Sequence, residues 1–132
     1  MRILICGLPN SGKTTLAEEL HRLTRFPHLN ADHIRTLCDD WDFSMEGRIR
    51  QAKRLRRLSK SFARSITDFV APTEEIRKIF GADITIWMDT VKESKYKDTD
   101  KIFEPADWCH YHIVTKDAKK WAKFIYGSLF NG

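Results

Sequence analysis

The chain has 132 residues, enough for one hydrophobic core and too few for two ordinary domains, so we expect a single domain over residues 1–132. Hydrophobic residues make up 42% and charged residues 31%, as in soluble globular proteins, and no apolar run approaches the roughly 20 residues that span a bilayer. The net charge of +5 is uneven: residues 44–64 carry +7 (eight basic residues, one acidic) and the remainder −2. Such a basic segment can form a solvated helix face, a binding site for an anionic substrate or a surface that binds nucleic acid.

The first half of the chain alternates short apolar runs with helical patterns. Residues 2–6 form an apolar run that ends at Gly7, which is typical of a buried strand. Apolar spacing then predicts a helix over about 13–24, and a second short strand is expected over 27–31. Over 44–63, apolar residues three or four apart predict a long amphipathic helix with Ser44 as its N-cap and a basic outer face.

The second half continues the alternation. We expect strands over 66–71, 83–88 and 110–114, a short helix between Thr73 and Phe80, and a closing helix from Asp117. The polar, lysine-rich stretch of about 90–107 is predicted to be a mobile, lid-like loop. Strands that alternate with helices imply right-handed crossovers and a three-layer α/β fold with a parallel, five-stranded sheet.

A glycine-rich loop lies between the first strand and the first helix. Residues 7–14 match Gly-x-x-x-x-Gly-Lys-Thr, the P-loop pattern, in the strand–turn–helix context that it requires. We therefore predict ATP binding by Gly7, Leu8, Pro9, Asn10, Ser11, Gly12, Lys13, Thr14 and Thr15. Lys13 should reach the β and γ phosphates, and the Thr14 hydroxyl should face Mg²⁺. No Asn-Lys-x-Asp guanine motif is present and the chain is small for a motor, which favours a small-molecule kinase with a P-loop NTPase-type fold.

Phosphoryl transfer also needs a carboxylate that holds magnesium or positions the attacking hydroxyl. Asp89 follows an apolar strand as a Walker B aspartate would, while Asp68 and Asp32 lie at or near the ends of other strands. The residue pattern alone leaves all three open.

Five segments occur in the order seen in adenylylsulfate (APS) kinases, and over residues 1 to about 90 the chain resembles that family. They are residues 7–15, 29–35, 42–44 with Arg48 and Arg54, 69–72 and 88–90. The resemblance implies transfer of the ATP γ-phosphate to the 3′-hydroxyl of adenosine 5′-phosphosulfate, a step of sulfate assimilation.

The resemblance also implies roles for individual residues. Asp32 matches the second aspartate of the family's Asp-Gly-Asp-Asn-x-Arg motif, the catalytic base or magnesium partner, and Arg35 matches the arginine that grips the acceptor's phosphosulfate. Phe43 matches an aromatic residue that stacks on the acceptor adenine, and Arg48 a second acceptor-binding arginine. In the lid, where no arginine occurs, Lys95 is expected to help neutralise phosphate charge.

The chain departs from the family pattern at three positions. Asn30 replaces the first aspartate of the motif, His33 replaces its asparagine, and Ala71 stands where many members carry a phosphorylatable serine. These changes put the acceptor's identity in doubt more than the use of ATP, and we expect weaker or altered activity.

Two alternatives stay open: a kinase of another small hydroxyl or nucleotide acceptor, and a non-catalytic ATP-binding protein that regulates or binds nucleic acid through the basic segment. Nucleic acid is disfavoured because the basic helix lacks interleaved aromatic residues. No membrane partner is expected, and the resemblance leaves a homodimer open. The N-terminal residues lack the cleavage site of a secretory signal and the three cysteines are scattered, so we expect a cytoplasmic protein.

Overall fold

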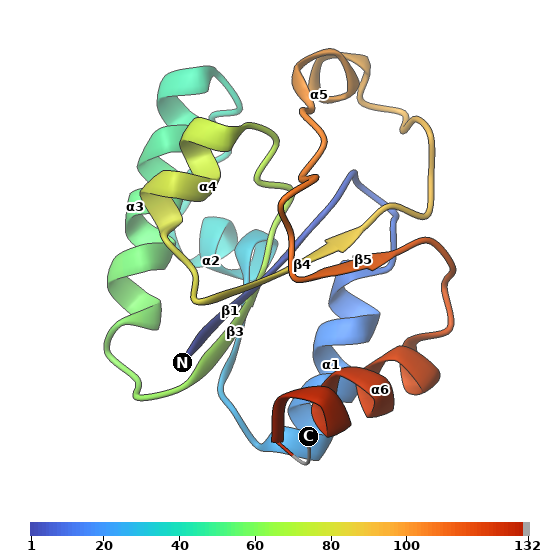
Figure 1. Cartoon of the computed structure of the whole chain (residues 1–132). Coiled ribbons are helices and arrows are strands. Elements are labelled where there is room, and N and C mark those ends of the chain that lie inside the picture. Colours follow the sequence, from blue (N-terminus) through green and yellow to red (C-terminus); the bar gives the residue numbers. More distant parts are fainter. Residues whose placement is uncertain (131–132) are drawn as a thin grey trace.

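The computed structural model describes residues 1–130, in which helices cover both faces of a parallel sheet (Figure 1). The strand order is β2-β3-β1-β4-β5, so β1 lies at the centre with β3 and β4 beside it. In chain order the elements are β1 (Arg2–Cys6), α1 (Lys13–Thr24), β2 (His28–Asn30), α2 (Ala31–Cys38), α3 (Met45–Ser59), β3 (Ser65–Asp68), α4 (Glu74–Phe80), β4 (Ile84–Met88), α5 (Lys97–Ile102), β5 (Tyr111–Ile113) and α6 (Ala118–Phe130). This architecture confirms the predicted three-layer α/β fold with five parallel strands.

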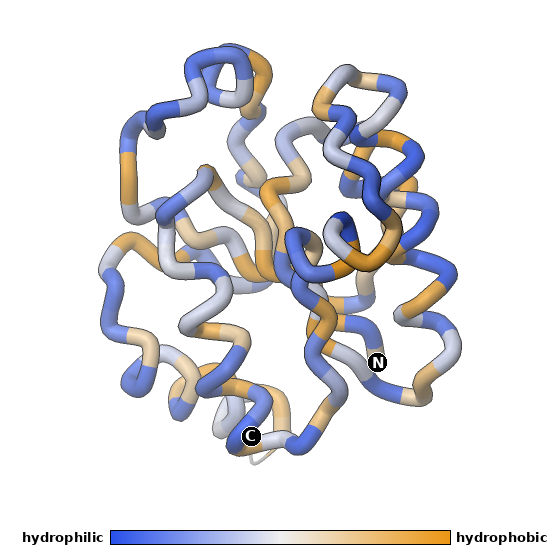
Figure 2. Tube along the Cα trace, turned by 180° about the vertical axis from the view of Figure 1, so that it is seen from behind, coloured by the Kyte–Doolittle hydropathy of each residue, from blue (hydrophilic) through white to orange (hydrophobic). Residues whose placement is uncertain are grey.

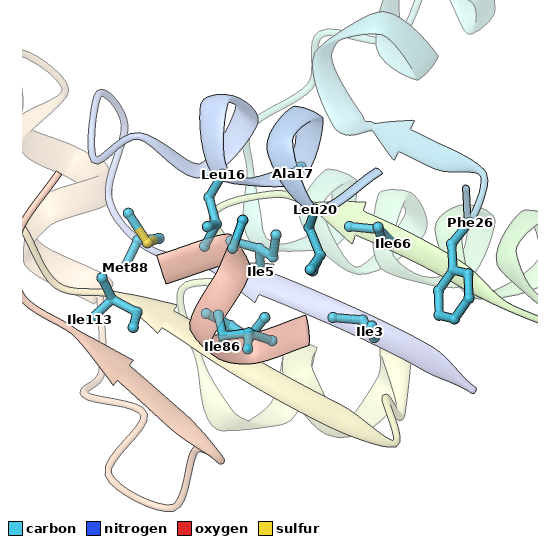
Figure 3. Close-up of a cluster of buried hydrophobic side chains, with 12 residues drawn as sticks. Ile3, Ile5, Leu16, Ala17, Leu20, Phe26, Ile66, Ile86, Met88 and Ile113 are labelled. Carbon is cyan, nitrogen blue, oxygen red and sulfur yellow. The ribbon is translucent and has the colours of Figure 1, made fainter. Parts of the chain in front are cut away.

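Side chains on β1 alternate between the two faces of the sheet, and each face builds its own core. Ile3 and Ile5 face α1 and α6, and Figure 3 shows Leu16 and Leu20 of α1 lying against them. All four of these side chains are fully buried. The core on this face consists of Ile3, Ile5, Leu16, Ala17, Leu20, Phe26, Ile66, Ile86, Met88, Ile113, Ala122 and Ile125.

Leu4 and Cys6 face the other way, toward α2, α3 and α4. The core there includes Leu55 of α3 and Phe80 of α4, both fully buried. In the view from behind, orange hydrophobic residues recur between blue hydrophilic ones along the outer helices (Figure 2). The helices are thus amphipathic, as their sequence spacing predicts.

Two predicted elements end three or four residues earlier than expected. The strand predicted over 66–71 ends at Asp68, because the backbone then turns sharply enough to put Ala71 at a φ of +44° before Pro72. The helix predicted over 44–63 starts as expected after its cap Ser44, which accepts a hydrogen bond from the Gly47 amide, but it ends at Ser59. The prediction extended the helix too far because it counted Leu58 and Phe62 among the core positions, whereas both side chains are exposed.

The second strand also ends early, at Asn30, because Asn30 caps a new helix. Its side chain accepts a hydrogen bond from the His33 amide, so that α2 begins at Ala31, inside the predicted strand. Within the predicted loop over 90–107, α5 forms one short helix that stands above the sheet in Figure 1. Among residues 1–130, no helix combines the length and apolar character needed to cross a bilayer.

Candidate active site

The phosphate loop connects β1 to α1, and its glycines are required by its geometry. Gly7 has a φ of +153° and Gly12 a φ of +95°, both of which disfavour residues with a side chain. A Cβ at Gly7 would lie 2.5 Å from the carbonyl oxygen of Met88. Gly12 precedes α1 without a side-chain cap, so the first amides of the helix can donate to an anion.

Lys13 begins α1 and bends back over the loop, where its Nζ donates to the carbonyl of Leu8 at 2.9 Å. Burial lowers the pKa of Lys13, while the negative charges of Asp68 and Asp32 act in the opposite direction. A phosphate oxygen can replace the Leu8 carbonyl as the hydrogen-bond acceptor of this ammonium group. Lys13 is therefore placed to stabilise a bound polyphosphate.

Beside the loop, three side chains converge on the carboxylate of Asp68, the last residue of β3. Thr14 Oγ1 donates to Asp68 Oδ1 at 2.9 Å, and Asn30 Nδ2 donates to the same oxygen at 3.1 Å. His28 Nε2 lies 2.5 Å from Oδ2. Asp68 is 2% exposed, so these contacts keep a buried carboxylate in one orientation.

The other two candidate aspartates have different surroundings. Asp32, in the first turn of α2, is exposed, and its carboxylate has no hydrogen-bond partner within residues 1–130. Asp89 hydrogen-bonds to His112 Nε2 at 2.9 Å and lines a separate cavity of about 150 Å³. β4 thus delivers Asp89 to a different cavity from the one that Lys13 lines.

The segment between α2 and α3 forms an aromatic wall. The guanidinium of Arg35 lies 4.4 Å from the centre of the Phe43 ring and that of Arg48 lies 5.5 Å from it. Trp41 packs next to Phe43, and both are about half exposed. An exposed aromatic face beside two guanidinium groups suits a flat ring that carries anionic groups.

Asp40 holds this wall in place. Arg50 and Arg54 of α3 donate to its carboxylate at 2.9 and 2.8 Å, and Arg35 lies 3.8 Å from it. These bonds to Arg50 and Arg54 keep the pKa of Asp40 well below its ordinary value. Arg35 Nη1 also donates to the carbonyls of Asp40 and Asp42. Two basic residues of α3, Arg50 and Arg54, are therefore ion-paired within the fold.

The lid segment 90–107 touches the wall through one hydrogen bond, in which Arg48 Nη2 donates to Thr99 Oγ1 at 2.8 Å. Lys95 is exposed and lies 5.3 Å from the ring centre of Tyr96. The expected acceptor residue Arg48 thus also contacts α5, a link that the sequence pattern did not indicate.

One cleft of about 1690 Å³ joins these parts. Among its lining residues are Lys13, Thr14, Asp32, Arg35, Phe43, Arg48 and Lys95, together with Pro9, Asn10, Gly12 and Thr15 of the loop. The loop residues Gly7, Leu8 and Ser11 do not line this cleft. The cleft also contains Asn30 and Trp41, which the sequence prediction did not assign to the site, and Asp68, which it kept open as a candidate carboxylate.

A phosphate loop at the centre of a parallel sheet, in one cleft with an aromatic and basic wall, is typical of the class of P-loop kinases. The adenylylsulphate kinase family model matches residues 1–107, and the chain belongs to that family. No curated protein sequence matches the chain significantly.

Solved structures show the same fold. The APS kinase of Mycobacterium tuberculosis, in complex with AMPPNP and APS, is 19% identical with a TM-score of 0.74 (97% of this chain and 96% of that one). Shikimate kinase from Acinetobacter baumannii, in complex with shikimate, is 21% identical with a TM-score of 0.74 (98% and 93%). A gluconokinase from Sinorhizobium meliloti is 11% identical with a TM-score of 0.67 (98% and 95%).

Proposed function

We propose that the protein is an ATP-dependent phosphotransferase that moves the γ-phosphate of ATP to the 3′-hydroxyl of adenosine 5′-phosphosulfate. One observation carries this proposal: the same cleft is lined by Lys13 of the phosphate loop, by Asp32, and by the wall of Phe43, Arg35 and Arg48. Donor and acceptor would therefore bind side by side, as direct phosphoryl transfer requires.

In the proposed reaction, the acceptor hydroxyl attacks the γ-phosphorus, the bond to the β–γ bridging oxygen breaks, and ADP leaves. Lys13 exchanges its bond to the Leu8 carbonyl for phosphate oxygens and stabilises the charge that develops on them. Asp32, which lines the cleft, orients the hydroxyl and takes its proton.

The acceptor wall suits a nucleotide that carries phosphosulfate. The Phe43 ring offers a stacking surface for adenine, and Arg35 and Arg48, which lie over the ring, supply positive charge beside it. Lys95 of the lid adds a mobile positive charge on the cleft surface. These roles match the ones that the family resemblance implies.

Magnesium is part of the proposal, and the residues present fit it. Mg²⁺ prefers oxygen ligands and is commonly held by nucleotide phosphates together with one or two protein oxygens. Thr14, an exposed residue whose hydroxyl lies beside the Asp68 carboxylate, can supply such an oxygen. When bound, the ion would neutralise charge on the β and γ phosphates.

The proposal is tested by measuring ADP release from ATP and Mg²⁺ with APS, shikimate or gluconate as acceptor. We expect rapid release with APS, accompanied by a 3′-phosphorylated product in mass spectrometry, and background rates with the other two. Preferential turnover of shikimate or gluconate would instead support the alternative of another hydroxyl acceptor, whose kinases share this fold.

Replacing Phe43 by alanine should raise the KM for APS about tenfold and leave the KM for ATP unchanged. Stacking of a base on an aromatic ring contributes about 1–3 kcal/mol, and about 1.4 kcal/mol corresponds to a factor of ten. Phe124→Ala, at an equally exposed phenylalanine on α6, is the control and should change neither KM. An unchanged KM for APS in Phe43→Ala would remove Phe43 from the acceptor site.

The structure gives little support to the alternative that the basic segment 44–64 binds nucleic acid. Arg50 and Arg54 are paired with Asp40, Arg48 contacts the lid, and Arg56 donates to the carbonyl of Phe80. Half of the eight basic residues in segment 44–64 are thus engaged inside the fold.

A further inference from the structure

The guanidinium of Arg77, on α4, is buried without a carboxylate bonded to it. Its side chain is 0% exposed, and the carboxylate of Glu74 lies 3.6 Å from Nη1, too far for a hydrogen bond. Nη1 has no hydrogen-bond partner among residues 1–130. Burying such a charge costs free energy unless hydrogen bonds replace the lost water. The other two nitrogen atoms of Arg77 make those bonds, and both acceptors are backbone carbonyl groups.

The two carbonyl groups belong to segments that are far apart in the sequence. Nε of Arg77 donates to the carbonyl of Ala71 at 2.8 Å, in the turn that follows β3 and lines the cleft. Nη2 donates to the carbonyl of Glu104 at 2.5 Å, two residues after α5 ends. Because the guanidinium is a rigid plane, it sets the spacing between the cleft turn and the end of the lid segment.

Further contacts join the same two segments. The amide of Glu104 donates to the carbonyl of Pro72 at 2.7 Å, and the amide of Glu74 donates to Glu104 Oε1 at 3.3 Å. The guanidinium of Arg77 also lies 5.2 Å from the ring centre of Phe103. These contacts between residues 71–77 and residues 103–104 form what we call the lid junction. Arg77 is central to it, because it binds both segments.

The lid junction is linked to the acceptor wall through α5, which stands above the sheet in Figure 1. Thr99 of α5 is 6% exposed and accepts the 2.8 Å hydrogen bond from Arg48. The start of the lid segment is tied to the phosphate loop instead, where Thr90 Oγ1 donates to the carbonyl of Ser11 at 2.6 Å. A displacement of Glu104 would therefore move α5 relative to Arg48 more than it disturbs the phosphate loop.

We propose that Arg77 is a positioning residue for the acceptor: it holds the lid junction so that α5 stays against the acceptor wall. Arg77 does not line the cleft, so it acts through the backbone of Ala71 and Glu104 and not by touching the substrate. The inference rests on the proposed function, because APS is the acceptor with which it is tested.

The test replaces Arg77 by lysine, which keeps the charge but has a single nitrogen that cannot span both carbonyl groups as a guanidinium does. The KM for APS should rise about tenfold and the Kd for AMPPNP should stay within about twofold, because only the acceptor half depends on the lid junction. A merely structural Arg77 would leave the KM of the folded variant unchanged. Arg56→Lys is the matched control, since Arg56 donates to the carbonyl of Phe80 outside the cleft, and it should change neither constant.

A measurement on the unaltered protein covers the case in which Arg77→Lys does not fold. Coupling between two sites is reciprocal, so a lid junction that favours APS binding about tenfold must itself be favoured by bound APS to the same extent. With AMPPNP bound, adding APS should therefore slow hydrogen exchange of the Glu104 amide about tenfold. The amide of Gly81, which bonds to the Arg77 carbonyl at the other end of α4, should exchange at the same rate with and without APS.

Two results would overturn this inference alone: an unchanged KM for APS in folded Arg77→Lys, or a Glu104 amide whose exchange is the same with APS bound. Turnover of APS by the unaltered protein tests the proposed function separately. If the unaltered protein with AMPPNP does not bind APS, the proposed function is wrong and this inference is wrong with it.

Discussion

Replacing Lys13 by alanine is expected to lower kcat/KM for ATP in the APS-dependent reaction by roughly 100- to 1000-fold, the loss typical of removing one preorganised donor from a transition state. Lys13 is buried at the start of α1, and its only described hydrogen bond, to the Leu8 carbonyl, is within the phosphate loop. Its removal therefore leaves the sheet intact and takes away the positive charge nearest the transferring group. The measurement is coupled detection of ADP at saturating APS.

The control for Lys13→Ala is Lys123→Ala, which removes an exposed lysine from α6 and should keep full activity. Far-UV circular dichroism and thermal melting of both variants separate loss of chemistry from loss of fold. Full activity of a folded Lys13→Ala protein would show that the loop does not act on the phosphate that is transferred.

The second large effect is expected from Gly7→Ala, which should raise the Kd for AMPPNP roughly 10- to 100-fold. The added Cβ would lie 2.5 Å from the Met88 carbonyl oxygen and 2.8 Å from Ser11 Oγ, at a φ of +153°. Backbone strain of this kind costs about 1–3 kcal/mol, and the loop relieves it by moving its amides away from the phosphates. Isothermal titration calorimetry with AMPPNP measures the change.

Gly127→Ala is the matched control, because a Cβ at Gly127 of α6 would meet no atom within 4 Å. That substitution should leave the Kd unchanged and raise the free energy of unfolding by up to about 1 kcal/mol, since alanine favours a helix more than glycine does. An unaltered Kd in Gly7→Ala would mean that the loop tolerates a different path from the one described.

The sequence predicted the parts of the fold that depend on local signals. The apolar run before Gly7, the P-loop spacing and the apolar stripe led to β1, the loop and α1 with correct bounds, because each is set by neighbours in the chain. Thr73 and Gly81 likewise marked the two ends of α4. The six-residue helix α5 was missed, since it is too short to show a helical period and has no side-chain cap.

The site was harder to predict, because the ranking of Asp32, Asp68 and Asp89 depends on which strands are neighbours. β3 lies next to β1 and points Asp68 at Thr14, whereas β4 delivers Asp89 to His112. No local pattern encodes that order.

The roles proposed for Asp32, Arg35, Phe43, Arg48 and Lys95 stay predictions that the binding and kinetic measurements above address. The structure contributes their common location on one cleft. It also shows that Arg35 and Arg48 each have a structural contact besides any contact with an acceptor, to the 40–42 backbone and to Thr99 respectively.

The ion pairs of Asp40 bear on how tightly an acceptor can be held. Because Arg50 and Arg54 tether the segment between α2 and α3 through Asp40, the recognition surface is already rigid before any ligand arrives. The conformational entropy of these side chains is lost when the protein folds, so it does not have to be lost again when an acceptor binds. Salt screens exposed pairs more than buried ones, so concentrated salt should weaken the half-exposed Arg50–Asp40 pair more than the largely buried Arg54–Asp40 pair, while the phosphate loop, held by backbone geometry, keeps its shape.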